Sequence, residues 1–199
     1  MKLKIIFLIL ILSTSNLFLY SQETDNSNKI KLYNDLSNAE ISPINQKNVI
    51  KLKDVKNKVI VVVFFAAWCN PCTQQVKNLI EIKTEFQKED LFIIGLDADE
   101  EDKTDFDRFL GKKVAKNSTI RGSSSDSKDF WKFLKKNKIN YPLGFVKESL
   151  FQSLYQVSKR DAIPQTIIIQ DGEIKEIYVG GGKTFKRFTD KLKEIFNKN

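Results

Sequence analysis

The sequence contains no histidine, and its 199 residues include only two cysteines. The absence of histidine excludes a Ser-His-Asp triad and a Cys-His nucleophile. A structural zinc site takes four protein ligands, and a catalytic zinc site takes three. Two cysteines without histidine therefore argue against an intramolecular zinc site, and we expect no metal centre. The two cysteines are the first candidates for chemistry.

Arginine is scarce, so lysine supplies most of the positive charge. The chain has 33 Lys and Arg against 25 Asp and Glu, a formal net charge of +8. Such a charge can attract nucleic acid or an anionic membrane surface, or can serve solubility. No stacking-aromatic or base-reading motif accompanies it, so we expect no nucleic-acid partner. The length and the 41% hydrophobic content fit one globular domain with a leader.

Residues 1–22 have the composition of a secretion signal. Lys2 and Lys4 precede eight consecutive apolar residues, Ile5–Leu12, which match the basic and apolar regions of a signal peptide. Polar residues 13–16 interrupt the run, which is shorter than the roughly 20 apolar residues of a membrane span. We predict a signal peptide, with an uncleaved N-terminal anchor as the alternative. Either form implies an exported, periplasmic domain, and the lack of cysteine in the leader excludes a lipoprotein anchor.

Hydrophobic periodicity predicts the first half of the domain. Residues 23–48 are polar and are predicted to be a linker or N-terminal segment, and a short edge strand is expected at 49–52. Residues 59–65 are β-branched and aromatic, which is typical of a strand buried on both faces. A helix follows from Pro71, and residues 91–96 form a second buried strand. Strand, helix and strand in this order predict a βαβ unit with parallel strands.

Two blocks of opposite charge occupy the middle of the chain. Residues 97–107 hold seven acidic residues and one lysine, and residues 112–138 hold nine basic and two acidic residues. The blocks could neutralise one another on a solvated surface. Alternatively, the basic block contacts an anionic partner such as a membrane surface.

The C-terminal third predicts a hairpin and a closing helix. Residues 165–170 and 173–179 have strand composition, and Asp171-Gly172 between them is a tight-turn sequence. Residues 183–197 place their aromatic and aliphatic side chains at helical spacing, which predicts an amphipathic helix.

The two cysteines lie in the sequence Trp68-Cys69-Asn70-Pro71-Cys72, between the first long strand and its helix. A helix N-terminus favours negative charge, which lowers the pKa of a thiol at Cys69. Pro71 suits the first helical turn, and two intervening residues bring Cys72 within disulfide reach. We expect Cys69 to attack a substrate disulfide and Cys72 to resolve the mixed disulfide. A plain structural bridge or half of a metal site is the alternative for any Cys-x-x-Cys pair.

Four segments carry a family resemblance. They are Phe64-Phe65-Ala66-Ala67-Trp68-Cys69-Asn70-Pro71-Cys72, Val49–Lys58, Ile139-Asn140-Tyr141-Pro142 and Ile163-Pro164-Gln165-Thr166. Together they resemble the TlpA/ResA-type branch of the thioredoxins over about residues 49–196. The resemblance implies an α/β thioredoxin fold: a central mixed sheet flanked by helices, in a domain over 49–199 with an insertion at about 98–125.

The resemblance also implies a site. Pro164 would be cis and would pack beside Cys69 and Cys72; a trans proline at a strand edge is the alternative. Ile163 would offer its backbone to an incoming substrate strand. Trp68 would flank the site, although packing in the core is an equal alternative.

Two departures from the family pattern concern proton transfer. Val63 stands where many thioredoxins have a buried aspartate, and Gln75 stands where ResA-type proteins have a glutamate. Both usual acceptors of the Cys72 proton are therefore missing, although Gln75 can still form hydrogen bonds. Asp97 is the one acid that could substitute, and a surface loop is the expected place for it.

The leading function is reduction of client-protein disulfides outside the cytoplasm, with cytochrome c maturation as one possible setting. No cofactor is expected beyond the Cys69–Cys72 disulfide, and a membrane thiol reductase would donate electrons. The alternatives are a disulfide-forming oxidase, a peroxidase and a non-catalytic binding module. The intact Cys-x-Pro-Cys argues against the binding module, and the lack of a histidine between the cysteines argues against a strong oxidase.

Overall fold

The computed structural model describes residues 25–44, 48–97, 99, 132, 134–136, 139–146 and 148–197. The predicted leader, nearly all of the predicted insertion and most of the basic block lie outside these residues, so those predictions stand as expectations. Within the described part of the chain, no helix is long and apolar enough to cross a membrane.

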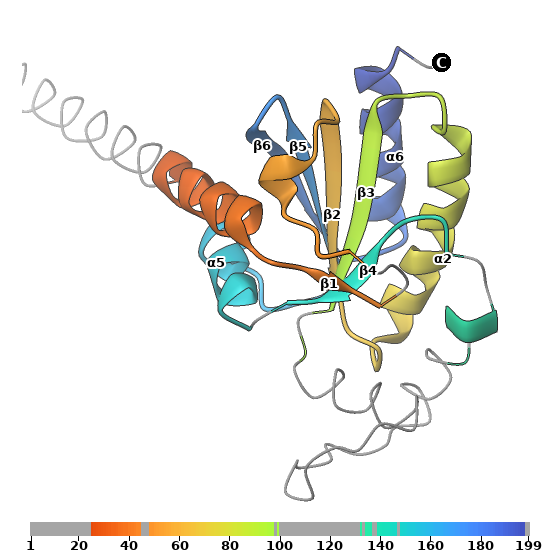
Figure 1. The fold of residues 1–199 in the computed structure, drawn as a ribbon, viewed down its shortest axis with the longest axis horizontal. Helices are drawn as coiled ribbons and strands as arrows, with labels where there is room; N and C mark the ends of the chain where they lie inside the picture. Colours follow the sequence, from red (N-terminus) through yellow and green to blue (C-terminus); the bar gives the residue numbers. More distant parts are fainter. Residues whose placement is uncertain are drawn as a thin grey trace, which may run out of the picture.

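A six-stranded mixed sheet forms the centre of the molecule (Figure 1), in the order β1-β4-β3-β2-β5-β6. The strands are β1 (Ser42–Pro43), β2 (Val59–Phe65), β3 (Leu91–Asp97), β4 (Leu143–Phe145), β5 (Gln165–Gln170) and β6 (Glu173–Val179). The named helices are the 3-10 helix η1 (Leu52–Asp54) and the α-helices α2 (Asn70–Glu85), α5 (Glu148–Ser158) and α6 (Lys183–Ile195). Strand β2 runs parallel to β3 and antiparallel to β5, which confirms the βαβ unit and the predicted fold class.

Helices cover both faces of the sheet and create two cores. Alternate residues of β2 point to opposite faces: Val61 and Val63 belong to one core, and Val62 and Phe64 belong to the other. Helices α2 and α6 cover the first face, while α5 and the helix over residues 25–38 cover the second (Figure 1). All seven residues of β2 are buried, as its unbroken apolar run predicted.

Of the two predictions for residues 23–48, linker or N-terminal segment, the linker is wrong over residues 25–38, because these residues form a helix that packs on the sheet. Leu32 and Leu36 lie one helical turn apart and are both fully buried. The polar residues around them concealed this narrow apolar stripe. The Asp35 carboxylate adds a polar link, since it accepts a 2.6 Å hydrogen bond from Ser153 on α5.

The predicted edge strand at 49–52 is also wrong. Ile50 makes a single antiparallel bridge with Ile41, and the chain then turns through η1. The edge of the sheet is instead β1, which pairs with β4.

The C-terminal hairpin and helix form as predicted. Asp171 and Gly172 both have positive φ, 52° and 78°, which suits a two-residue hairpin turn between β5 and β6. Helix α6 ends at Ile195, two residues earlier than expected, and buries Phe188 and Leu192 against the sheet.

Candidate active site

Cys69 caps the N-terminus of α2 directly after β2. Its backbone is extended, helix α2 begins at Asn70, and Pro71 occupies the first turn. The N–H of Cys72 points at the Cys69 Sγ over 3.3 Å. Because this N–H and the helix dipole both favour negative charge, the position stabilises a Cys69 thiolate after reduction.

Cys69 and Cys72 form a disulfide with an S–S distance of 2.01 Å. Cys69 retains 5% exposure and Cys72 is fully buried, so only Cys69 has any solvent contact. Asn70 and Pro71, between the cysteines, are exposed on the surface beside them. An incoming disulfide therefore meets Cys69 first, consistent with its predicted role as the attacking thiol.

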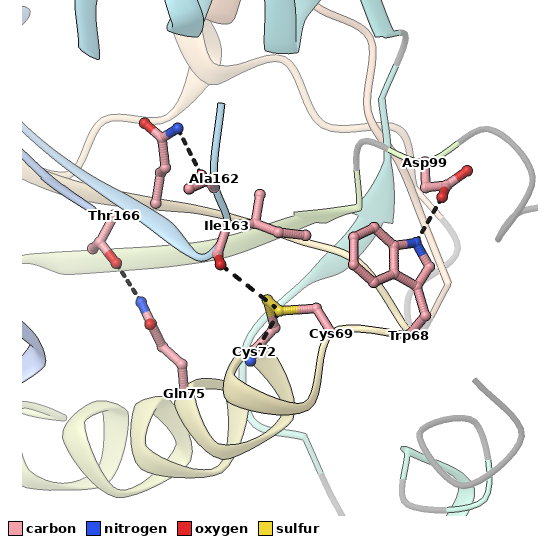
Figure 2. Close-up of a disulfide and its surroundings, with 9 residues drawn as sticks. Trp68, Cys69, Cys72, Gln75, Asp99, Ala162, Ile163 and Thr166 are labelled. Carbon is pink, nitrogen blue, oxygen red and sulfur yellow. Dashed lines mark hydrogen bonds between the residues drawn. A yellow bond between two sulfur atoms is a disulfide. The ribbon is translucent and has the colours of Figure 1, made fainter. Parts of the chain in front are cut away.

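The loop before β5 meets the disulfide from the opposite side. The Ile163–Pro164 peptide bond is cis, as expected. The carbonyl oxygen of Ile163 lies 3.9 Å from the Cys69 Sγ, as Figure 2 shows. This contact brings residues 94 positions apart to one site, and Ile163 is partly exposed there.

Trp68 flanks the site and does not pack in the core. Its side chain is 49% exposed, and its indole N–H donates a 2.7 Å hydrogen bond to the Asp99 carboxylate. The backbone N–H of Asp99 in turn donates to Oδ1 of Asp97 over 3.0 Å. The end of β3 thus positions the indole beside the disulfide (Figure 2).

The environment beneath the disulfide is built from neutral side chains. Gln75 is buried one turn after Cys72, and its Nε2 donates to the Thr166 hydroxyl on β5. Its Oε1 is buried and accepts no hydrogen bond from the described residues. Val63, which pairs with Thr166 in register, is fully buried. The two positions where the family resemblance places an acid therefore hold an amide and an isopropyl group in this chain.

Asp97 is not the surface residue that the sequence suggested. It is the last residue of β3, pairs with Phe65 on β2 and is only 1% exposed. An acid that ends a buried strand in parallel pairing lies near the carboxyl end of the neighbouring strand. Here that neighbour, β2, leads into Cys69. Asp97 is therefore connected to the site by two hydrogen bonds, one from the Asp99 N–H to Asp97 and one from the Trp68 indole to Asp99.

Sequence reasoning missed Asp99, Gln165 and the pairing partner of Gln75. Asp99 lies within a block of seven acidic residues, and no local signal distinguishes it from the others. Gln165 and Thr166 were noted only as parts of the Ile-Pro-x-Thr match. No group of three His, Cys, Asp or Glu side chains among the described residues could hold a metal ion.

The β2–α2–β3 unit, the cysteine pair at the start of α2 and the cis-proline before β5 define a thioredoxin fold with a Cys-x-x-Cys site. The chain belongs to the AhpC/TSA family, whose model matches residues 35–177.

Among curated proteins, the chain is similar to the thiol-disulfide oxidoreductase ResA of Bacillus thuringiensis, with 27% identity over 99 residues. That match covers 50% of this chain and 57% of the relative, so the chain spans little more than half the length of the curated relatives it matches. A thioredoxin from Geodia cydonium is 38% identical over 53 residues, covering 27% of this chain and 48% of that protein.

Two solved structures illustrate the fold. The thioredoxin domain of a thiol-disulfide oxidoreductase from Bacteroides vulgatus has a TM-score of 0.51 at 16% identity, over 79% of this chain and 94% of that chain. A thiol-disulfide isomerase from Corynebacterium glutamicum has a TM-score of 0.51 at 15% identity, over 76% of this chain and 88% of that chain. At these identities the similarity establishes the thioredoxin fold and nothing finer.

Proposed function

We propose that this protein is an extracytoplasmic thiol–disulfide oxidoreductase that reduces disulfides in client proteins. One observation carries the proposal: the Cys69 Sγ lies at the N-terminus of α2, bonded to Cys72 and 3.9 Å from the Ile163 carbonyl oxygen. A structural bridge requires no helix N-terminus and no adjoining strand-like loop. A dithiol that exchanges with a peptide disulfide benefits from both, because the helix N-terminus stabilises the attacking thiolate and the loop backbone can pair with an extended chain.

The exchange proceeds in two steps. The Cys69 thiolate attacks one sulfur of the client disulfide, and the other client sulfur leaves as a thiolate that takes a proton from water. Cys72 then loses its proton and attacks the Cys69 Sγ, which releases the second client thiolate. The client gains two electrons, and the protein is left with the Cys69–Cys72 disulfide. A thiol reductant must return those two electrons before the next cycle.

The client binds in this proposal as an extended segment beside Ile163. The backbone of Ile163, a partly exposed residue, pairs with the segment, and the exposed Trp68 ring lies on the other side of Cys69. Both contacts are independent of client sequence, which suits a protein that acts on several disulfides.

The location and the electron donor belong to the same proposal. The leader over residues 1–22 supports export, and an exported dithiol requires a reductant that spans the membrane, so we assign the donor role to a membrane thiol reductase. We include cytochrome c maturation in the proposal as one setting for the clients, on the resemblance of the active-site and cis-proline segments to the TlpA/ResA-type branch. Contact of the basic residues between 112 and 138 with an anionic membrane surface is a further part of the proposal.

The test uses the full chain in two settings. The reduced protein is mixed with an extended peptide that carries one disulfide, and both thiol pairs are followed by alkylation and mass spectrometry. We expect two peptide thiols to form for each Cys69–Cys72 disulfide; no exchange would reject the proposal. Alkylation in living cells then gives the direction. A mostly reduced pair supports a reductase, and a mostly oxidised pair favours a disulfide-forming oxidase.

A further inference from the structure

The side chain of Gln165 connects the core to the loop that faces the disulfide. Gln165 is fully buried in β5, between Phe64 of β2 and Val179 of β6. Its Nε2 donates two hydrogen bonds, to the carbonyl oxygen of Arg160 over 2.9 Å and to that of Ala162 over 2.8 Å. One buried amide therefore holds two points of the loop.

The loop that Gln165 holds is exposed. Residues 160–162 follow the end of α5 and lie on the surface, and Ile163 is partly exposed. The Pro164 carbonyl accepts a 2.8 Å hydrogen bond from the Gly180 N–H. With the carbonyls of Arg160, Ala162 and Pro164 engaged, the backbone around Ile163 has a defined orientation. The Ile163 carbonyl is then directed at Cys69 (Figure 2).

The Oε1 atom of Gln165 has no hydrogen-bond donor among the described residues, which points to the two Nε2 hydrogen bonds as the reason for an amide at this buried position. Oε1 is buried and accepts no hydrogen bond from the described residues. A buried polar atom without a partner destabilises the folded state, and an apolar side chain of similar volume would avoid that cost. Ile167 and Ile168, two and three residues further along β5, are buried apolar side chains and illustrate the apolar alternative. The amide is thus explained by the two carbonyls it binds.

We propose that Gln165 is a positioning residue for client capture. Its amide fixes the direction of the Ile163 backbone, so it determines how well an extended protein segment pairs beside Cys69. It does not touch the sulfurs, and a small disulfide that needs no backbone pairing reacts without its help. This inference rests on the proposed function, because it assumes that peptide disulfides are substrates.

The test compares two disulfides. Gln165→Met preserves the side-chain length and removes both donors. For reduction of the extended peptide disulfide, we expect kcat/KM to fall about tenfold, mainly through KM, because two hydrogen bonds that orient the loop are lost. The rate with 5,5′-dithiobis(2-nitrobenzoate), a small disulfide, should stay within about twofold. The control is Asn140→Leu, which removes an amide that donates to the Ile80 carbonyl away from the loop; both rates should stay at the wild-type level.

Three outcomes overturn the inference or its basis. Equal loss with both disulfides means a general structural role, and no loss with either means no role. A wild type that reduces the small disulfide but not the peptide rejects the proposed function itself. A separate measurement on wild type needs no folded variant: both Nε2 protons of Gln165 should exchange slowly with solvent by NMR, and fast exchange would refute the two hydrogen bonds.

Discussion

The carbonyl oxygen of Ile163 lies 3.9 Å from the Sγ of Cys69, although 94 residues separate the two in sequence. The sulfur is held at the start of α2 and the carbonyl at the start of β5, and strand β2 adjoins both elements. Pairing of β2 with β5 therefore sets the distance between the Cys69 sulfur and the backbone that we propose receives a client segment.

The two cysteines should behave differently in trapping experiments. Cys69 caps α2 and has some exposure, whereas Cys72 has none. With Cys72→Ala, attack by Cys69 still occurs but resolution is blocked, so mixed disulfides with a peptide should accumulate to near stoichiometry. With Cys69→Ala we expect none. The measurement is non-reducing gel electrophoresis with mass spectrometry, and equal trapping by Cys69→Ala would reverse the assignment.

Replacing the neutral amide at the site should add a proton acceptor. Gln75 is buried one turn from Cys72, so Gln75→Glu places a carboxylate where the Cys72 proton leaves. We expect the resolving step to become at least about tenfold faster above the pKa of the new carboxyl, with an added inflection in the pH–rate profile. Stopped-flow reduction of a model disulfide measures this step. The control is Gln74→Glu, since Gln74 is exposed.

The same Gln75→Glu variant has a predictable stability profile. Burial raises the pKa of the introduced carboxyl above its unfolded value of about 4.3. The folded state then holds the proton more tightly, so the variant is closest to wild type below about pH 4 and loses stability as the pH rises through the raised pKa. Urea unfolding across pH tests the sign.

The same stopped-flow measurement tests whether wild type already has a proton acceptor. If the rate of the resolving step in wild type depends on pH and Asp97→Asn removes that dependence, Asp97 is the existing acceptor.

The N-terminal helix should contribute directly to stability. Leu32 and Leu36 are fully buried against the sheet, so Leu32→Ala or Leu36→Ala should each lower the free energy of unfolding by about 2–5 kcal/mol. Ile30 on the same helix is 55% exposed, and Ile30→Ala should change it by less than about 0.5 kcal/mol. Urea unfolding monitored by circular dichroism compares the three. Similar small effects for all would mean that residues 25–38 do not pack in solution.

Acid should weaken the polar link between that helix and α5. The hydrogen bond from Ser153, followed by that from Lys31, holds the pKa of the Asp35 carboxyl below its usual value. A depressed folded-state pKa stabilises the protein above the unfolded value of about 3.9, and this stabilisation disappears as the pH falls through the folded pKa. Ser153→Ala should cost about 1 kcal/mol at pH 7 and less at pH 3. Ser149→Ala, at an exposed position of α5, should show no such pH dependence.

Trp68 and Asp99 should be energetically coupled. Their hydrogen bond is 2.7 Å long, so Asp99→Ala and Trp68→Phe should each remove about 1 kcal/mol of stability, and the double variant should lose little more than either. Asp99→Asn keeps an acceptor and should lie near wild type. Chemical denaturation of the four proteins completes the cycle, and additive losses would show that the contact contributes nothing.

Local sequence determined the elements whose signals lie within one or two turns. The apolar run of β2 specified a strand buried on both faces, and Asp171-Gly172 specified the hairpin turn, because backbone conformation at these places follows from neighbouring residues. The position of Cys69 at the start of a helix could be predicted for the same reason. The cysteine pair and its place at a helix N-terminus therefore follow from a few adjacent residues, and the predicted order of attack rests on the same residues.

Tertiary structure alone decided which distant groups meet. Trp68 meets Asp99 across 31 positions, and Asp35 meets Ser153 across 118. Nothing near either residue marks its partner, since each contact depends on which strands pair and which face each helix covers. The same reason explains why residues 25–38 were predicted to be a linker. Leu32 and Leu36 are recognisable as core residues only once the sheet that they pack against is known.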